Sequence, residues 1–467
     1  MNPSKNKWLE LLIVLSAPLL SVIDTFIINV AIPAIKQGVH ATDAEMQLVI
    51  SGYLLGYAAF LITGGRAGDQ FGRKKVFFWG MLAFTIASCL CGLSMTALQL
   101  NITRFVQGLS ASFMVPQTIA FIQILFTDKK ERAKAIGLFG ITLGVAAVIG
   151  QVLGGYLSDT HWAIEGWRLI FFINLPIGIM TLWATYKYVN ETKTNHKSKF
   201  DYSGTFILTL ALFCLIYPLI EGREKGWPLW SIVLLFTSIG IFTYFIYNQK
   251  QKLLNNKNPL IDVRLFKIKD FNIGLLAALF HFMLHTSYLL LSAVYLQNGL
   301  GISAMNCGLY FILPGILFIL SSLIASKLIV RFGKRVLQVG VLLLSITFLL
   351  QIQFLKPGLS TWMIISLMSL WGLGNGLVLP SLLNIALKSV PVEYAGAAAG
   401  IYSTFQQTAS ALGVCIIGGI FFYFSGQSWQ IGYTAGITAI LVCLALVGLM
   451  LFLLPEEKPV LQTILSE

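Results

Sequence analysis

The feature that most constrains this chain is a succession of long apolar segments. A helix needs roughly 20 apolar residues to cross the hydrocarbon core of a membrane. The 467 residues contain fourteen such segments, and only 11% of the residues are charged. The segments lack the period-two alternation of a membrane β-barrel. The sequence therefore predicts an all-α integral membrane protein, with spans at about 9–35, 46–64, 76–96, 98–126, 134–158, 167–188, 203–221, 228–248, 271–297, 304–326, 336–355, 361–387, 396–424 and 430–454.

Basic residues are distributed unevenly between the loops. If successive spans alternate in direction, the loops on the side of the N-terminus carry 26 Lys and Arg residues, and those on the other side carry five. Loops rich in Lys and Arg stay in the cytoplasm. We therefore expect a multi-pass protein of a bacterial inner membrane with both termini cytoplasmic. The net charge of +13 is then a topology signal and does not indicate nucleic-acid binding.

Two stretches of the sequence recur in both halves of the chain. The loop at residues 65–75 has a degenerate copy at 325–335, and the Gly-Leu…Pro pattern at 108–116 recurs at 372–380. Repeated halves are a common architecture of transporters, with the transport site between them. We expect a six-helix bundle at residues 1–190, two additional helices with linkers at 191–255, and a second six-helix bundle at 256–467.

Several motifs occur in a fixed order along the chain. They are Asp24-x-x-x-x-Asn29-x-Ala31-x-Pro33, Gly65-x-x-x-Asp69-x-x-Gly72-Arg73-Lys74, Arg104-x-x-Gln107-Gly108, and the stretches 167–178 and 258–266. Together they resemble the major facilitator superfamily, specifically its fourteen-helix drug:proton antiporter branch, over nearly the whole chain. The resemblance implies the major facilitator fold, with two extra helices. It also implies multidrug efflux and antibiotic resistance, driven by the proton gradient without any cofactor.

The loop motif is the first of two motifs linked to conformational change. It comprises Gly65, Asp69, Gly72, Arg73 and Lys74. We expect its charges to form a latch between helices in one conformation and to release it in the other. A plain topology signal is the alternative.

The second conformational motif lies in the fifth predicted span. The antiporter branch usually reads Gly-Pro-x-x-Gly-Gly there, whereas this chain reads Gly150-Gln151-x-x-Gly154-Gly155. The glycines permit close helix packing. Gln151 replaces the proline, and with it any kink that the proline would supply.

Two charged residues lie well inside predicted spans. At 1.5 Å per residue, Asp24 is roughly 16 Å deep and Arg104 roughly 9 Å deep, counted from the same side. A charge inside the bilayer is costly and therefore a functional candidate. A carboxylate that receives a proton and a substrate in turn would suit an exchanger, so we assign proton coupling to Asp24 and Arg104, and substrate contact to Asp24. A static ion pair is the alternative.

A polar face runs along the ninth predicted span. His281, His285, Tyr288 and Ser292 follow the i, i+4, i+7, i+11 spacing of one helical face. Imidazoles titrate near physiological pH, so this face is a candidate for substrate binding or proton relay. Neutral histidines bonded across the bundle are the alternative. No third ligand supports a metal site.

Three glutamines within spans are further candidates for substrate contacts. They are Gln107 in the fourth span, and Gln406 and Gln407 in the thirteenth. Each could line the transport cavity, and hydrogen bonding between helices is the alternative.

These observations favour proton-coupled export of lipophilic, cationic or amphipathic small molecules by alternating access. No Gly-x-x-x-x-Gly-Lys-Ser/Thr loop is present, so ATP would not drive transport directly. The expected partners are the substrate, protons and membrane lipids, for a monomer that binds no nucleic acid. Export of one dedicated metabolite, such as a siderophore, is an alternative. A non-transporting sensor or assembly partner is another, and no residue constellation favours an enzyme.

Overall fold

The computed structural model describes residues 7–160, 164–192, 201–255, 257–391 and 394–454. These residues form helices and connecting turns, with no strand among them. Fourteen helical segments of the described chain are long and apolar enough to cross a membrane, which confirms the predicted number of spans and the all-α class. The two termini and the predicted boundary at residue 256 lie outside the described residues.

The helices divide into a first half, an additional pair and a second half. The first half contains α1 (Lys7–Val14), α2 (Ser16–Gly38), α3 (Asp43–Phe71), α4 (Arg73–Leu93), α5 (Ala97–Leu125), α6 (Lys129–Ser158), α7 (Gly166–Phe172) and α8 (Asn174–Tyr188). The additional pair is α9 (Tyr202–Glu224) and α10 (Leu229–Leu254). The second half contains η1 (Val263–Lys267), α11 (Lys269–Val294), η2 (Tyr295–Gly299), α12 (Ala304–Tyr310), α13 (Ile312–Phe332), α14 (Arg335–Phe354), α15 (Thr361–Leu387), α16 (Ala395–Ser425) and α17 (Trp429–Leu453).

Local sequence signals set several of these helix boundaries. Thr42 and Glu45 form a capping box at the start of α3, in which each side chain accepts a hydrogen bond from the other residue's backbone N–H. Helices α3 and α13 end at Gly72 and Gly333, whose φ angles of 102° and 54° favour glycine. In the repeated loops at 65–75 and 325–335, each of these glycines follows a Phe and precedes two basic residues.

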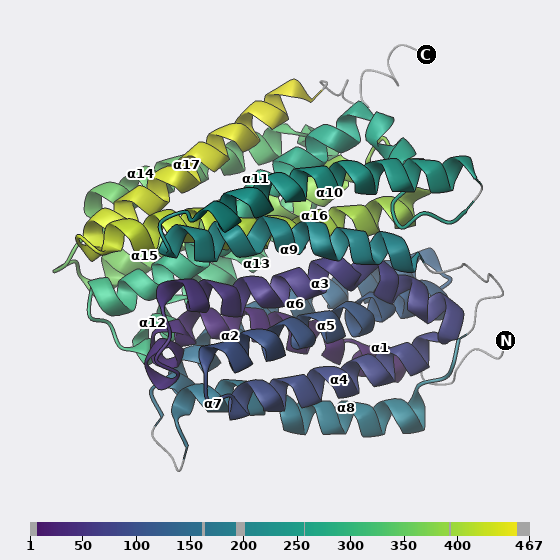
Figure 1. Ribbon diagram of the computed structural model, residues 1–467, viewed down its shortest axis with the longest axis horizontal. Coiled ribbons are helices and arrows are strands. Elements are labelled where there is room, and N and C mark those ends of the chain that lie inside the picture. Colours follow the sequence, from purple (N-terminus) through teal and green to yellow (C-terminus); the bar gives the residue numbers. More distant parts are fainter. Residues whose placement is uncertain (1–6, 161–163, 193–200, 256, 392–393, 455–467) are drawn as a thin grey trace.

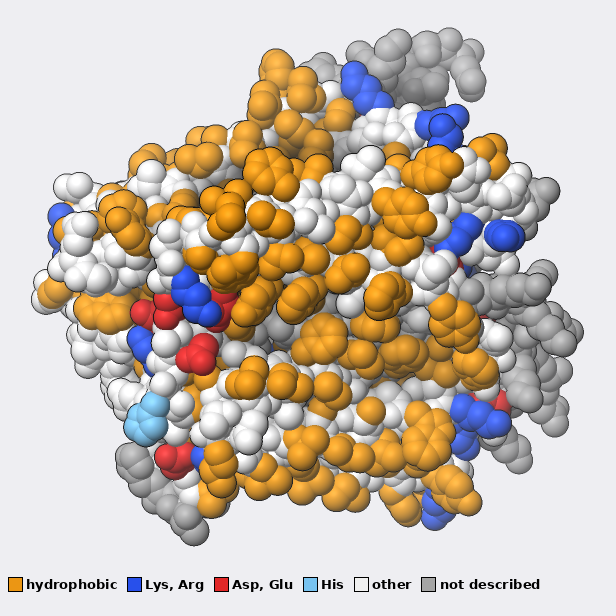
Figure 2. All heavy atoms as spheres, in the orientation of Figure 1, with side chains coloured by type: hydrophobic (Ala, Val, Ile, Leu, Met, Phe, Trp, Pro, Cys, Tyr) orange, Lys and Arg blue, Asp and Glu red, His pale blue; other side chains and the backbone are white. Residues whose placement is uncertain are grey.

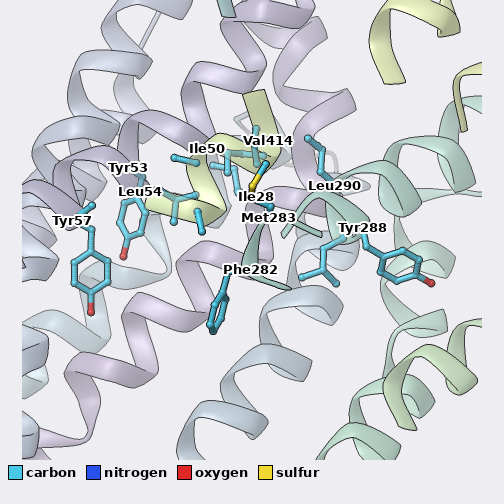
Figure 3. Close-up of a cluster of buried hydrophobic side chains, with 14 of the residues drawn as sticks. Ile28, Ile50, Tyr53, Leu54, Tyr57, Phe282, Met283, Tyr288, Leu290 and Val414 are labelled. Atoms are coloured by element: carbon cyan, nitrogen blue, oxygen red, sulfur yellow. The ribbon is translucent and has the colours of Figure 1, made fainter. Parts of the chain in front are cut away.

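The two halves lie side by side, and the additional pair is at their junction (Figure 1). Helix α3 packs on α16, α2 packs on α11, and α6 packs on α12 and α13. Helix α9 contacts both α3 and α16. Figure 3 shows the apolar core of this junction, where Ile28 and Ile50 of the first half lie near Met283 and Val414 of the second.

The backbones of the two halves come close together where α6 ends and α12 begins, which we call the closed end. A Cβ atom at Gly155 would overlap the Ala304 carbonyl, and one at Gly308 would overlap the Gln151 carbonyl. By contrast, a Cβ at Gly137, near the start of α6, would have no atom within 4 Å. Because successive spans alternate in direction, the start of α6 lies at the end of the molecule opposite to the closed end, where α1 begins.

Helix α9 is bonded to both halves at the closed end. Arg223 donates a hydrogen bond to the carbonyl of Gly419 on α16. The carboxylate of the next residue, Glu224, accepts from the backbone N–H of Ala44 on α3 at 3.0 Å. Nearer the other end, the Thr205 hydroxyl lies 2.7 Å from the Thr63 hydroxyl of α3. The additional pair is therefore attached to the two halves and not merely adjacent to them.

Apolar side chains cover the middle of the molecular surface. Figure 2 shows them spread over the central part of this face, with Lys and Arg side chains gathered toward its two ends. Large apolar side chains such as Trp79, Phe236 and Leu342 are 64%, 70% and 62% exposed. A surface of this kind is stable in contact with lipid and not with water.

Asp201 organises the segment that leads into the second half. Its carboxylate accepts hydrogen bonds from Lys252 and Gln249 of α10, and from the backbone N–H of Leu260 at 2.9 Å. Arg66 of α3 donates to the neighbouring Pro259 carbonyl at 2.6 Å. The stretch 258–266, which the sequence singled out without a role, is therefore held to the additional pair and to the first half.

The charge of Asp201 is expected to stabilise the fold at neutral pH. Burial raises the pKa of Asp201, but its hydrogen bonds outweigh burial and hold the pKa below the ordinary value. A lowered folded pKa gives stability that is present above the unfolded pKa of about 4 and is lost as the pH falls through the folded value. We expect Asp201→Asn to cost about 2 kcal/mol at neutral pH, and less in acid.

Thermal unfolding in detergent at neutral pH and at about pH 3 measures this difference. Asp262→Asn is the matched control, since Asp262 also precedes a helix but pairs with Arg264, whose side chain is 53% exposed. A surface ion pair contributes little. An Asp201→Asn loss that is equal at both pH values would contradict the prediction.

Candidate functional site

The first candidate cluster centres on Asp24 and Arg104. Asp24 lies on α2 and Arg104 on α5, and their side chains form an ion pair. Asp24 is completely buried and Arg104 is 1% exposed. The structure thus brings together the two charged residues that the sequence places inside spans.

Amide side chains complete this cluster. Gln107 donates to Asp24 Oδ1 at 2.7 Å and accepts from Arg104 Nη1 at 2.7 Å. Asn174 of α8 lies 3.4 Å from the same carboxylate oxygen and donates to Ser88 at 2.9 Å. Gln107 was predicted to line a cavity, and here it binds the ion pair. Asn174 was missed, although an amide within an apolar stretch is a visible signal.

Arg104 is held by two further contacts. Its Nε donates to the carbonyl of Val49 on α3 at 3.1 Å, and its guanidinium lies 4.4 Å from the ring centre of Tyr53. The positive charge therefore has a carboxylate, a carbonyl and an aromatic face around it. The cluster as a whole carries no net charge, which lowers the cost of burying it.

The second cluster lies in the second half and is built around Asn375 of α15. The Asn375 Oδ1 lies 2.9 Å from His281 Nε2, and its Nδ2 lies 2.9 Å from His285 Nδ1. His281 is completely buried, whereas His285 is half-buried. The two predicted histidines are therefore bridged by a single amide that the sequence analysis did not identify.

The rest of the predicted polar face of α11 points into the same half. Tyr288 accepts a hydrogen bond from Gln351 of α14 at 3.0 Å and stacks on Trp371 of α15, with ring centres 4.6 Å apart. Trp371 also stacks on His285 at 5.6 Å. Ser292 is 2% exposed. The spacing on one face identified residues that do lie together, and their partners came from distant spans.

Phe26 of the first half contacts the second cluster across the junction. It follows Asp24 by two residues on α2, and its ring centre lies 6.5 Å from that of His285. Gln406 and Gln407 of α16 are half-buried, and the structure places neither of them in a hydrogen bond with either cluster. The candidates from the sequence thus fall into two groups, with these two glutamines outside both.

The predicted latch lies within the first half. Arg73, the first residue of α4, donates to Asp69 of α3 at 2.7 Å. The backbone N–H groups of Lys74 and Lys75 donate to the carboxylate of Glu191, which caps the start of α4. Glu191 follows α8 and was not identified from the sequence.

Two glycines of this loop motif have different neighbours. A Cβ at Gly65 would make only ordinary contact with Pro116, whereas one at Gly72 would overlap the Glu191 carboxylate. Because of its positive φ and this contact, Gly72 has no substitute there.

The glycines of α6 permit close packing on both sides. A Cβ at Gly150 or Gly154 would crowd α2 near Ile27, and Gly155 faces α12 as described above. Gln151 is 3% exposed, and neither its Nε2 nor its Oε1 has a hydrogen-bond partner among the described residues. A buried amide without partners is costly to stability.

No group of three or more His, Cys, Asp or Glu side chains in the described part of the chain is placed to hold a metal ion. One ring nitrogen of each histidine, His281 Nε2 and His285 Nδ1, is instead hydrogen-bonded to Asn375.

Comparisons with known proteins agree on one family. The Major Facilitator Superfamily sequence model matches residues 14–414. A probable actinorhodin transporter of Streptomyces coelicolor is 32% identical over 91% of this chain and 74% of its own length. The multidrug resistance protein Stp of Mycobacterium tuberculosis is 30% identical over 85% and 73%. The tetracenomycin C resistance and export protein of Streptomyces glaucescens is 30% identical over 88% and 75%.

Solved structures share the fold at low sequence identity. A bacterial homologue of the human lysosomal transporter Spinster superimposes with a TM-score of 0.68 at 16% identity, over 96% of this chain and 97% of that one. The D-xylose-proton symporter gives 0.67 at 14% identity, over 96% and 98%.

Proposed function

The chain belongs to the Major Facilitator Superfamily, and from this premise we propose that it exports lipophilic, cationic or amphipathic small molecules in exchange for protons. Its family makes it a multi-pass membrane transporter of small molecules and not an enzyme. The names of its relatives support drug and antibiotic export. The proton gradient would supply the energy, with no cofactor, to a monomer surrounded by lipid.

The proposed orientation places both termini in the cytoplasm of a bacterial cell. The excess of Lys and Arg in the loops on that side supports it. The closed end then faces outward, so the contacts between α6 and α12 would block the outer route. Alternating access would require the contacts between α6 and α12 to separate.

The buried ion pair of Asp24 and Arg104 is the observation that carries the coupling proposal. A charged pair within spanning helices is costly to maintain. A proton on Asp24 would cancel its attraction for Arg104 and free that guanidinium to move. The cluster would thus have two arrangements, one for each protonation state, and proton entry could be linked to the conformational change.

Substrate-triggered proton movement in proteoliposomes tests this function. The vesicles hold a pH-sensitive dye, and ethidium serves as the first trial substrate. We expect ethidium to drive protons across the membrane in vesicles that contain the protein, and not in empty vesicles. Binding of ethidium without any proton movement would favour a non-transporting sensor instead.

Dedicated export of one metabolite is the second candidate. Two of the relatives are named for a single compound each, actinorhodin and tetracenomycin C. A panel of unrelated lipophilic compounds distinguishes the candidates, because a dedicated exporter would respond to one chemical class only.

A further inference from the structure

We propose that Phe26, His281, Phe282, His285, Trp371 and Asn375 form a recognition site for planar aromatic compounds that carry carbonyl or phenol oxygens and no positive charge. We call these six residues the aromatic site. The inference rests on the proposed export function and specifies the substrate class. It also differs from the expectation that cations are the main substrates.

The distribution of acidic residues is the first argument. Between Phe271 and Leu453, the sequence contains one acidic residue, Glu393, which lies outside the described residues. In the first half, the charge of Asp24 is matched by Arg104. The spans around the aromatic site therefore offer no unmatched carboxylate for a cation.

The hydrogen bonds of Asn375 place a proton on His281 Nε2 and leave His285 neutral. An amide oxygen only accepts, so His281 must donate from Nε2, and in the neutral ring its Nδ1 is an acceptor. An amide nitrogen only donates, so His285 must accept at Nδ1, which leaves its Nε2–H as a donor. A second proton on His285 would oppose the Asn375 amide hydrogens.

Several polar atoms at the site have no partner among the described residues. They are His281 Nδ1 and Trp371 Nε1, together with the hydroxyl of Tyr402, whose ring lies 6.4 Å from Phe282. All three side chains are at most 5% exposed. Buried polar groups of this kind are usually satisfied. The N–H groups of Trp371 and His285 and the hydroxyl of Tyr402 suit the oxygens of a quinone or phenol. The Nδ1 atom of neutral His281 suits a phenol hydrogen.

Aromatic rings surround the polar atoms of the site and pack on one another. Trp371 stacks on His285, and Phe26 and Phe282 approach the same imidazole edge-on, at 6.5 and 6.4 Å. Figure 3 shows the Phe282 ring pointing away from Met283 and Val414, although Phe282 belongs to the same buried apolar cluster. A site lined by aromatic rings favours planar aromatic ligands. Because Phe26 belongs to the first half, a bound ligand would contact both halves.

Binding of two matched compounds to the purified full-length protein tests the proposal. Quinizarin (1,4-dihydroxyanthraquinone) carries the oxygens, and anthracene has the same three rings without them. Quenching of tryptophan fluorescence in detergent, corrected for empty micelles, reports binding. We expect quinizarin to bind about tenfold more tightly than anthracene, as a hydrogen bond to a buried donor predicts.

His285→Phe is the informative variant, because it retains a ring and removes the N–H donor. It should weaken quinizarin about tenfold and leave anthracene unchanged. Trp371→Phe serves the same purpose if His285→Phe does not fold. Ser366→Ala is the control, since Ser366 is an exposed residue of the same helix, α15, and should change neither affinity.

The outcomes separate this proposal from the proposed function. Equal binding of the two compounds, or His285→Phe and Trp371→Phe variants that bind both compounds as the native protein does, would overturn the aromatic site. Proton movement with ethidium alongside no quinizarin binding would reject the site and retain the transporter. Quinizarin binding that depends on His285, without proton movement by any compound, would retain the site and reject the export function.

Discussion

Asp24→Asn is expected to reduce substrate-driven proton movement by about a hundredfold or more, the typical contribution of a positioned proton-transfer group. The asparagine retains hydrogen bonding to Gln107, but it cannot take up and release a proton. Binding of substrate should survive, because the aromatic rings of the second half remain in place. Dye-loaded proteoliposomes measure the exchange, and fluorescence quenching measures the binding.

A stability effect accompanies this variant and needs its own control. Asparagine leaves Arg104 charged and buried without a counter-charge, which costs about 3–5 kcal/mol. The double variant Asp24→Asn/Arg104→Gln removes both charges and should recover much of the stability. It should still exchange no protons. Exchange at the native rate in the double variant would show that the pair is only structural.

Gly155→Val is expected to hold the closed end open. The added atoms would overlap the Ala304 carbonyl, and overpacking of this kind costs about 1–3 kcal/mol. Since about 1.4 kcal/mol is a tenfold change in an equilibrium, the closed conformation would lose about one to two orders of magnitude in population. Transport should fall accordingly, because alternating access requires both conformations.

Cys307 is a natural reporter of this change. It lies on α12 beside the closed end and is completely buried. We expect a maleimide to label Cys307 faster in Gly155→Val than in the native protein, as measured by mass spectrometry of the peptide. Gly137→Val is the matched control, because a side chain there would have no atom within 4 Å. Faster labelling in both variants would indicate general destabilisation instead.

The spans could be predicted from the sequence because membrane thickness fixes the length of an apolar run. The rotation of each helix about its axis could not, since helices that are apolar on every side give no periodic signal. Asp24 and Arg104 were exceptions, because a charge in such a helix must face the interior. Asn375 and Glu191 lie far along the chain from the groups they bind, so their roles appeared only in the structure.

The same limit applies to the stretch 258–266. Its sequence is distinctive, but its backbone groups meet Asp201 and Arg66 only where α9 packs against both α3 and α10. The repeated loops behaved differently, because each ends its helix at a glycine whose local backbone conformation is independent of distant partners. Local backbone constraints could therefore be predicted from the sequence, and contacts between distant spans could not.

The attachment of α9 to both halves has a consequence for the geometry of transport. Arg223 and Glu224 tie neighbouring points of α16 and α3 at one edge of the closed end. If these bonds persist while the halves move, the axis of rotation must pass near that edge and not through the centre of the molecule. The hinge axis would then run beside α9, and the outer end would open most widely on the side of α6 and α12. Substrate would leave in that direction.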